Sequence, residues 1–414
     1  MIRFINIQNF KSLEDTDVEL GPFNVFIGDN GAGKTSFFRA LGFLRDMIAS
    51  DSINAFLDAR GESFNDIVSL RADSKLINYH CRLTASTPQG EDVDASFAIS
   101  VRKRRFVYVH SESVMPWDRR GVSLEEDDID QVPYLVARFK QRMLAVEPGS
   151  RPLVLENATL PHSFLRDVHR ESLRRKSGTR FPRLSAVARS LLRYRHFEIW
   201  GPEALRRPSL VDQGRLGEDG SNLAHTLLRL RTTRREAFSS LLSELAAAYP
   251  WVDDIEFRRS ALSEVSLAFV EKSALRKKNL KKYSAHQVSD GFLRMLALQA
   301  LKHDPGLITT IAYEEPENGL HPQMISRAAR ALREIAATGT QVLVSTHSPL
   351  FISRVFEDRT AEQIQKELRL VRRDKAGRTT IRPPSIAVIQ EALENGFSTG
   401  DLWTMLLGED ELAG

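Results

Sequence analysis

The stretch Gly28-Asp29-Asn30-Gly31-Ala32-Gly33-Lys34-Thr35 decides the fold of this 414-residue chain. It follows the apolar run 23–27 and precedes apolar residues at helical spacing: Phe37, Leu41, Leu44 and Ile48. A buried strand, a glycine-rich turn and an amphipathic helix are the context that the pattern G-x-x-x-x-G-K-[ST] requires. Glycines let backbone N–H groups turn toward phosphate oxygens, and the following helix presents its positive end. The sequence therefore predicts a phosphate-binding loop.

Residue types in and just after this loop assign roles for a bound nucleotide. Lys34 is expected to reach the β and γ phosphates of ATP, and the Thr35 hydroxyl is expected to ligate Mg²⁺. The predicted nucleotide contacts in this segment are Gly28, Asp29, Asn30, Gly31, Ala32, Gly33, Lys34, Thr35 and Ser36.

A second apolar run, 307–313, ends in two carboxylates, Glu314 and Glu315. A metal–nucleotide site needs one carboxylate in the Mg²⁺ shell and another that polarises the attacking water. We assign Glu314 to the metal shell and Glu315 to the role of catalytic base. Paired glutamates after a strand are weak evidence alone, because solvated loop glutamates are common. The presence of the glycine loop in the same chain favours a functional role for the two glutamates.

Two further segments have the right order for the same chemistry. His347 follows the buried run 341–346, and the helix that separates it from Glu315 predicts a parallel crossover. His347 is therefore predicted to sense the γ-phosphate. Taken alone, a histidine at a strand end is more often a core or solvent-facing residue without such a role. Ser289, Asp290 and Gly291 open a helix whose N-terminal amides form another anion-binding end. Taken alone, they describe an ordinary capped helix.

The remaining pattern predicts an α/β fold with an inserted lid. We expect strands in the first 30 residues, an antiparallel meander over 75–113, and strands again over 254–270. Helical patches at 184–194 and 221–248, the latter capped by Ser221, predict a helical insertion. Three parts are expected: an N-terminal part of the nucleotide-binding domain over 1–113, an inserted helical lid over 114–253, and a C-terminal part of the same domain over 254–414.

Composition places limits on the class of protein. Hydrophobic residues make up 42% and charged residues 27%, which is ordinary for a globular protein. No apolar run is long enough to span a membrane, and the N-terminus does not resemble a secretory signal. Cys81 is the only cysteine, so an internal disulfide is excluded. We therefore expect a cytoplasmic protein.

Basic residues are clustered, although the net charge is only +4. One cluster is Arg102-Lys103-Arg104-Arg105, a second spans 166–183, and the densest runs from Lys272 to Lys282. An acidic run, 125–130, lies between them. A single charge run is usually a solvated face, but three basic clusters favour a phosphate-backbone partner such as DNA.

In order and spacing, these segments resemble the ABC-type ATPase heads of the SMC, RecF and OLD group. The chain is most similar to bacterial single-chain ATPases of the AAA type with a RecF-like or OLD-like ATPase domain. The resemblance covers the first 50 residues and about 285–355, with shorter similarities at 219–223 and 400–403. The segments behind it are Asn9-Phe10-Lys11-Ser12, 28–35, 289–291, 314–322 and 345–349.

The resemblance implies a head-to-tail homodimer or higher homo-oligomer. ATP would lie between the glycine loop of one copy and Ser289 to Gly291 of the other, with residues 318–322 along the seam. Lys11 and Ser12 are implied as nucleotide contacts. Position 314 is Glu where most relatives have Asp. A glutamine that links Mg²⁺ to the lid is also implied, and Gln89 is the candidate.

These features favour one function over three others. The leading hypothesis is an ATP-driven clamp on DNA, in repair or anti-phage defence. An intrinsic nuclease with a Toprim domain is not expected, because 67 residues follow His347, whereas a separate nuclease or toxin partner is compatible with the sequence. A transporter ATPase is disfavoured by the form of the Ser289-Asp290-Gly291-Phe292 segment. A scaffold that binds ATP without hydrolysing it is the alternative.

Overall fold

The computed structural model describes residues 1–71, 75–120, 132–139, 142–148, 150–155, 160–173, 180–198, 201–209, 212–272 and 281–401. The chain divides into two units, which are described separately below. Unit 1 comprises Met1–Tyr194 and Gln365–Pro384, and unit 2 comprises Arg195–Ile364 and Ser385–Gly414. Within the described ranges, no helix combines the length and hydropathy needed to cross a membrane.

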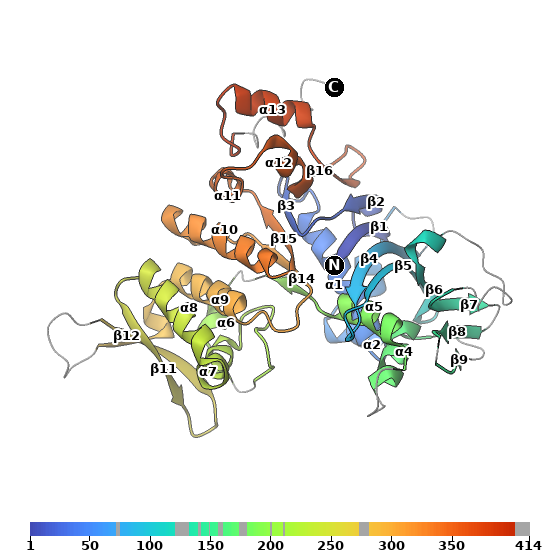
Figure 1. The fold of residues 1–414 in the computed structure, drawn as a ribbon, viewed down its shortest axis with the longest axis horizontal. Coiled ribbons are helices and arrows are strands. Elements are labelled where there is room, and N and C mark those ends of the chain that lie inside the picture. The colour runs from blue at the N-terminus through green and yellow to red at the C-terminus, as the bar shows by residue number, and fades with distance from the viewer. Residues whose placement is uncertain are drawn as a thin grey trace. The chain divides into compact units, whose positions relative to one another are not determined.

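Unit 1 contains an eight-stranded antiparallel sheet, with strand order β2-β1-β4-β5-β6-β7-β8-β9 (Figure 1). Alternating burial along β4 shows why it forms, since every second side chain enters the core. The strands are β1 (Ile2–Phe10), β2 (Leu13–Glu19), β4 (Leu76–Ser86), β5 (Asp92–Lys103), β6 (Val107–Pro116), β7 (Leu135–Phe139), β8 (Arg142–Val146) and β9 (Leu153–Leu155).

Strands β7 to β9 differ from the helical insertion that was predicted to begin at residue 114. They extend the predicted meander because β7 pairs with β6, and the hairpins continue outward to β9. Helical character begins only later, and it belongs to unit 1 up to Tyr194. Short, irregular strands separated by Pro and Gly do not show the sustained alternation on which strand prediction depends.

The other elements of unit 1 frame the glycine loop. Strand β3 (Phe23–Ile27) is buried throughout, pairs in parallel with β16 (Leu368–Arg373), and β16 pairs antiparallel with β17 (Thr379–Arg382). Phe26 packs against Phe37 and Phe38 with ring centroids 5.2 and 5.3 Å apart. The helices are α1 (Lys34–Ala49), α2 (Ile53–Ala59), α3 (Phe64–Ile67), α4 (Phe164–Leu173) and α5 (Pro182–Leu192), with a 3-10 turn, η1 (Trp117–Arg119).

Unit 2 contains the predicted parallel crossover. Strand β14 (Thr310–Glu314) pairs in parallel with β15 (Gln341–Thr346), and α10 (Pro322–Ala337) connects them, as predicted (Figure 1). The helix α9 (Asp290–His303) also lies where it was predicted, and it packs against α8 and α10. A three-stranded antiparallel sheet of β11 (Val252–Arg259), β12 (Val265–Glu271) and β13 (Lys282–Ser284) completes the main body.

The predicted helix over 221–248 is two helices, α7 (Leu223–Thr233) and α8 (Arg235–Ala248). They break at Arg234, whose backbone leaves the helical region. The prediction that Ser221 caps this segment is wrong, because Asn222 occupies the cap position. The other elements are β10 (Tyr194–Phe197), α6 (Pro202–Arg206), η3 (Ala285–Gln287), α11 (Pro349–Val355), α12 (Ala361–Glu367) and α13 (Ile386–Glu394).

Candidate functional site

In unit 1, two glycines of the loop lie against the β16–β17 hairpin. A Cβ added at Gly28 would lie 2.1 Å from the backbone oxygen of Val371. At Gly33, where φ is +116°, a Cβ would lie 2.3 Å from the Thr379 Oγ1 atom. Only glycine meets both the space and the left-handed backbone without strain. The hairpin therefore fixes the path of the loop from behind, while residues 29–31 stay exposed.

Lys34 begins helix α1 and lies across the loop. Its side chain is 7% exposed, and its Nζ atom donates to the backbone oxygens of Gly28 at 2.6 Å and Asp29 at 3.1 Å. The ammonium is thus placed beside the loop, where an anionic ligand would compete with neutral carbonyls for it. Thr35 and Ser36 follow in the first helical turn and are half-buried.

The turn between β1 and β2 joins this loop through Thr379. The Thr379 amide donates to the Ser12 backbone oxygen at 2.8 Å. Its buried Oγ1 atom lies 2.8 Å from both the Ser12 Oγ atom and the Ala32 backbone oxygen. The adjacent Lys11 has a left-handed backbone, with φ +50°. We call Lys11, Ser12, residues 28–36 and Thr379 the phosphate-loop cluster. No sequence pattern around Thr379 marked it as part of the loop.

In unit 2, Glu315 follows β14 in a backbone conformation that is unusual for its type. Its φ is +48°, and its amide donates to the Ser345 backbone oxygen at 2.9 Å. Asn318 Nδ2 donates to one carboxylate oxygen, and His347 Nδ1 lies 3.3 Å from the other. The Glu315 side chain is 13% exposed. A non-glycine residue held in this region costs free energy, and such positions cluster at functional sites.

Glu314 is buried and has a partner that sequence analysis missed. His196 Nε2 lies 2.7 Å from Glu314 Oε1, and the two side chains are 10% and 2% exposed. His196 belongs to β10, which neighbours β14 in the sheet order. It lies in a part of the sequence with no recognisable motif, so only the fold brings it to Glu314.

Glu317 is buried beside this pair of glutamates. Thr346 Oγ1 donates to its Oε1 atom at 2.5 Å, and its Oε2 atom has no partner among the described residues. Burial raises the pKa of the Glu317 carboxyl, and the hydrogen bond from Thr346 offsets only part of that effect.

The predicted signature residues pack against the loop that follows Glu315. Ser289 caps α9 by accepting from the Phe292 amide at 3.3 Å. A Cβ at Gly291 would lie 2.4 Å from the Gly319 backbone oxygen, so the helix approaches the loop at van der Waals contact. Arg294 of the same helix donates to the Asn318 backbone oxygen at 2.8 Å. We call Glu314, Glu315, residues 317–319, His347 and the start of α9 the glutamate cluster.

Asp290, beside Ser289, forms an ion pair with Arg206. Arg206 Nη2 lies 2.5 Å from Asp290 Oδ1, and it also donates to the Val288 backbone oxygen at 3.1 Å. An acidic side chain at a helix N-terminus opposes the binding of an anion there. The Arg206 guanidinium offsets that charge.

The structure does not support two sequence expectations, one about a nucleotide contact and one about DNA contacts. Gln89 lies in the β4–β5 turn, beyond the Ile2 end of β1, whereas Lys11 follows the Phe10 end, about 26 Å away along the strand. Basic residues of the 166–183 cluster that the structure describes pair internally. Arg170 pairs with Asp51 at 2.9 Å, Arg180 with Glu171 at 2.9 Å and Arg183 with Glu91 at 2.7 Å.

Other expectations lie outside the described residues. They include residues 273–280 of the basic run from Lys272 to Lys282, the acidic run 125–130 and residues 402–403 of the tail. Lys282 itself pairs with Glu256 at 2.8 Å.

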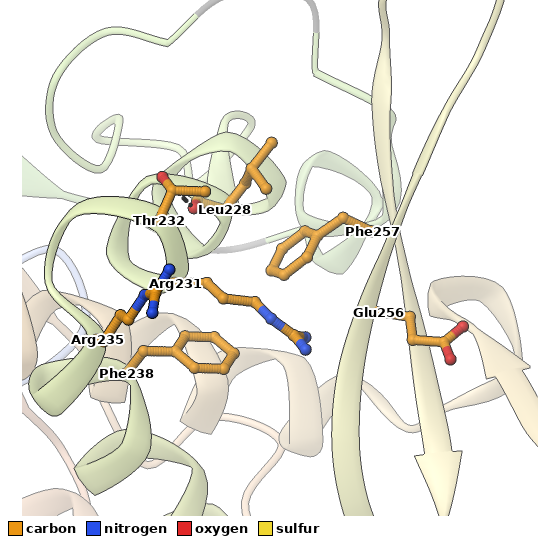
Figure 2. Close-up of a pocket in the computed structure, with 7 residues that line it drawn as sticks. All are labelled: Leu228, Arg231, Thr232, Arg235, Phe238, Glu256 and Phe257. Carbon is orange, nitrogen blue, oxygen red and sulfur yellow. Dashed lines mark hydrogen bonds between the residues drawn. The ribbon is translucent and has the colours of Figure 1, made fainter.

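Unit 2 also has a cavity of about 680 Å³ between α7, α8 and β11 (Figure 2). The Arg231 guanidinium extends between the rings of Phe238 and Phe257, 5.4 and 5.9 Å from their centroids, and pairs with Asp254 at 3.1 Å. Because Phe238, Phe257 and Asp254 hold this guanidinium, we assign Arg231 a structural role in the packing of unit 2. The residues lining the cavity do not belong to the predicted nucleotide motifs.

Comparisons with known proteins agree with the motifs. Residues 1–81 match a family described as "AAA ATPase domain", and residues 155–353 match one described as "AAA domain, putative AbiEii toxin, Type IV TA system". An OLD nuclease from Thermus scotoductus is 41% identical over 51 residues, which are 12% of this chain and 9% of that protein. The chain thus matches only a small part of that relative's length.

Solved SMC head structures are similar at low sequence identity. The SMC head domain from Thermotoga maritima is 12% identical with a TM-score of 0.43, over 93% of this chain and 99% of that one. An SMC head bound to the C-winged helix domain of ScpA is 14% identical with a TM-score of 0.48, over 94% and 99%.

The family matches fall on the two parts of the chain that hold the phosphate-loop and glutamate clusters. The first covers the glycine loop, and the second covers the start of α9, the paired glutamates and His347. The two segments of the chain that hold these clusters therefore each match a family of AAA-type domains.

Proposed function

We propose that the chain binds and hydrolyses ATP with Mg²⁺, and that it does so as an ATP-sandwiched dimer. The observation that supports hydrolysis most strongly is the arrangement around Glu315. A carboxylate in a left-handed backbone, contacted by Asn318 and His347 and partly exposed, is an expensive arrangement for a structural residue. It suits a base that must be held at one position.

The phosphate-loop cluster would bind the nucleotide. Backbone amides of the exposed loop and the N-terminus of α1 would contact the phosphate oxygens. Lys34 would exchange its carbonyl acceptors for the β and γ phosphates. Lys11 and Ser12 lie on a turn that Thr379 fastens to the same loop, which supports their assignment as contacts.

Each of the two clusters carries an oxygen donor of the kind that Mg²⁺ prefers. The Thr35 hydroxyl and the Glu314 carboxylate are hard oxygen ligands, and Mg²⁺ prefers one or two such groups with phosphates and water. Among the described residues, no group of three or more acidic, His or Cys side chains could hold a metal by itself. When bound, the ion would offset the negative charge of the phosphates.

In hydrolysis, the Glu315 carboxylate would accept a proton from water as the water oxygen bonds to the γ-phosphorus. The bond from that phosphorus to the bridging oxygen breaks, and ADP leaves. His347 contacts Glu315, and we assign it the role of sensing the γ-phosphate. Asn318 is a positioning residue, because it touches Glu315 and is itself held by Arg294 of the signature helix.

Dimerisation would complete the site with the signature helix of a second copy. Ser289 and Asp290 are exposed, so the helix end is accessible, and Arg206 offsets the charge of Asp290 where a γ-phosphate would approach. The loop 318–322 lies beside this helix end through the contact of Gly291 with Gly319. One face of unit 2 thus carries both segments that the family resemblance places at the seam.

Phosphate release with wild-type protein, Lys34→Ala and Glu315→Gln tests the enzymatic part. We expect Lys34→Ala to lose ATP binding, and Glu315→Gln to bind ATP while hydrolysing it about 10²–10⁴-fold more slowly. Wild-type protein that binds ATP and releases no phosphate would instead support the non-hydrolysing scaffold. Glu315→Gln with wild-type turnover would overturn the assignment of the base.

We further propose that ATP turnover controls association with DNA or with a separate effector, in anti-phage defence or in repair. The relatives include an OLD nuclease and a family named after a toxin, which favours effector control in defence. Co-purification from the native host, with and without ATP, tests this part. A nuclease or toxin recovered only in one nucleotide state is expected, and recovery of DNA alone would favour the clamp.

A further inference from the structure

Strand β6 carries a row of aromatic side chains on its outer face. Phe106 directly precedes the strand, and Tyr108 and His110 follow at every second position. The intervening Val107 and Val109 are 2% and 1% exposed, so the two sets point to opposite sides of the sheet. Phe106 is 48% exposed, which is unusual for a large apolar side chain on a solvent-facing sheet surface.

The rings in this row touch each other edge to face. Ring centroids are 6.1 Å apart for Phe106 and Tyr108 and 6.4 Å for Tyr108 and His110, with interplanar angles of 66° and 72°. Among the described residues, Phe106 and His110 have no ring contact other than with Tyr108. Because the rings are not stacked on one another, faces remain open for other flat groups.

Four consecutive cations lead into the row, namely Arg102, Lys103, Arg104 and Arg105. Arg102 lies opposite Tyr108 on the neighbouring strand β5. None of the four side chains forms an ion pair or hydrogen bond with another described residue, in contrast to the paired arginines of the 166–183 cluster. The nearby acid is Asp66, and its carboxylate is already bonded to the Ser63 amide at 2.6 Å.

We propose that this surface, residues 102–106 with Tyr108 and His110, binds single-stranded nucleic acid. Unpaired bases would stack on the aromatic rings, and the phosphates between them would contact the arginines. A duplex is a poorer ligand, because its bases are already stacked on each other and offer no free faces. The inference rests on the proposed function in part, since it names the class of nucleic acid that the ATPase would engage.

The same surface begins near a residue assigned to the nucleotide. Asn78 of β4 lies opposite Gln8 of β1, and Leu76 of β4 lies opposite Arg102 of β5. The β5–β6 turn and the β1–β2 turn therefore lie at the same end of the sheet in unit 1. A bound strand would reach the neighbourhood of Lys11, so its presence is expected to change the rate of ATP turnover.

Fluorescence anisotropy of a labelled 20-nucleotide oligothymidylate, with the full chain and without ATP, tests the proposal. Tyr108→Ala should bind about tenfold more weakly and Tyr108→Phe within about twofold of wild type. Arg104→Ala/Arg105→Ala should also bind more weakly and lower the slope of log K against log salt by about 1.4. A blunt duplex of equal length should bind more weakly than the single strand and show little change with Tyr108→Ala.

Arg258→Ala/Arg259→Ala is the matched control, because it removes two exposed arginines from the end of β11. It should leave the affinity for oligothymidylate within about twofold of wild type. Equal weakening by both arginine pairs, unchanged affinity in Tyr108→Ala, or no binding by wild type would each overturn the proposal. Thermal unfolding of each variant confirms that the fold is retained.

Phosphate release measured in parallel separates this inference from the proposed function. If wild type does not hydrolyse ATP but binds oligothymidylate in the expected pattern, the proposed ATPase activity is overturned and the proposed nucleic-acid surface is supported. If wild type hydrolyses ATP but does not bind oligothymidylate, the ATPase activity is supported and the nucleic-acid surface is overturned.

Discussion

In the phosphate-loop cluster, backbone atoms are held by packing, whereas in the glutamate cluster a side chain is held by hydrogen bonds. Gly28 and Gly33 lie so close to the β16–β17 hairpin that a single methyl group would not fit. Glu315 instead lies in an unfavourable backbone region and is contacted by Asn318 and His347. The phosphate-loop cluster should therefore be sensitive to added side-chain volume, and the glutamate cluster should be sensitive to the loss of polar contacts.

The largest expected effect tests the packing of the loop. Gly33→Ala combines a φ of +116° with a Cβ 2.3 Å from Thr379 Oγ1, so it should lower the free energy of unfolding by about 2–4 kcal/mol and abolish ATP binding. Gly31→Ala is the matched control, because its φ is also positive but open space surrounds it. It should cost only about 1–2 kcal/mol. Chemical denaturation measures both, and equal losses would show that packing by Thr379 is unimportant.

The next effect tests the hydrogen bonds of the glutamate cluster. Asn318→Ala removes the donor to the Glu315 carboxylate, so kcat for ATP should fall about tenfold while KM stays within about twofold. Asn318→Asp keeps the side-chain volume but places a second carboxylate beside Glu315. Its kcat should fall further than that of Asn318→Ala, because like charges repel. Steady-state phosphate release separates the two constants. A change confined to KM would instead make Asn318 a binding residue.

A third comparison isolates the backbone of Glu315 from its carboxylate. Both Glu315→Ala and Glu315→Gly remove the side chain contacts and should abolish hydrolysis. Because φ is +48°, the glycine variant should be more stable than the alanine variant by about 1 kcal/mol. At an ordinary position the order is the opposite. Thermal or urea unfolding of the two proteins therefore reports the backbone strain directly. Greater stability of the alanine variant would show that the backbone at position 315 is not strained.

The smallest effect is a pH dependence from Glu317. Burial raises the pKa of this carboxyl above 4.5 in the folded protein, so the folded state binds a proton more tightly than the unfolded chain. The contribution of Glu317 to stability is fully present below the unfolded pKa and is lost as pH rises through the folded pKa. Glu317→Gln keeps an acceptor for Thr346 and should gain stability relative to wild type as pH rises above 4.5. A stability difference independent of pH between 4.5 and 7 would contradict the raised pKa.

The sequence predicted the strand, glycine loop and helix around Gly33 correctly, because the determinants of this backbone are local. Gly28, Gly33 and Lys34 lie within one short segment, and each is required by the backbone of that segment. Thr379 escaped prediction because it joins the loop only through the fold, 346 residues after Gly33. Strand β15 was predicted at its observed bounds, since it is a short segment that is buried throughout.

The glutamate cluster was predicted only in part for the same physical reason. Glu314, Glu315 and His347 follow buried strands, and strand ends are visible in the sequence. His196, the partner of Glu314, comes from β10, and Arg206, the partner of Asp290, comes from α6. No local sequence pattern marks either residue. The strands β7 to β9 were missed because they are short and lack a sustained alternation, and the sheet they join supplies their stability.

The mass of Glu315→Gln in solution is the sharpest test of ATP-dependent dimerisation. With ATP and Mg²⁺, analytical ultracentrifugation should show a species of twice the 46.8 kDa chain mass, which disappears when ATP is removed. Adding Ser289→Arg to Glu315→Gln should prevent it, because the signature helix of the second copy could no longer approach the nucleotide. A Glu315→Gln protein that binds ATP and stays at the mass of one chain would overturn the proposed ATP-sandwiched dimer.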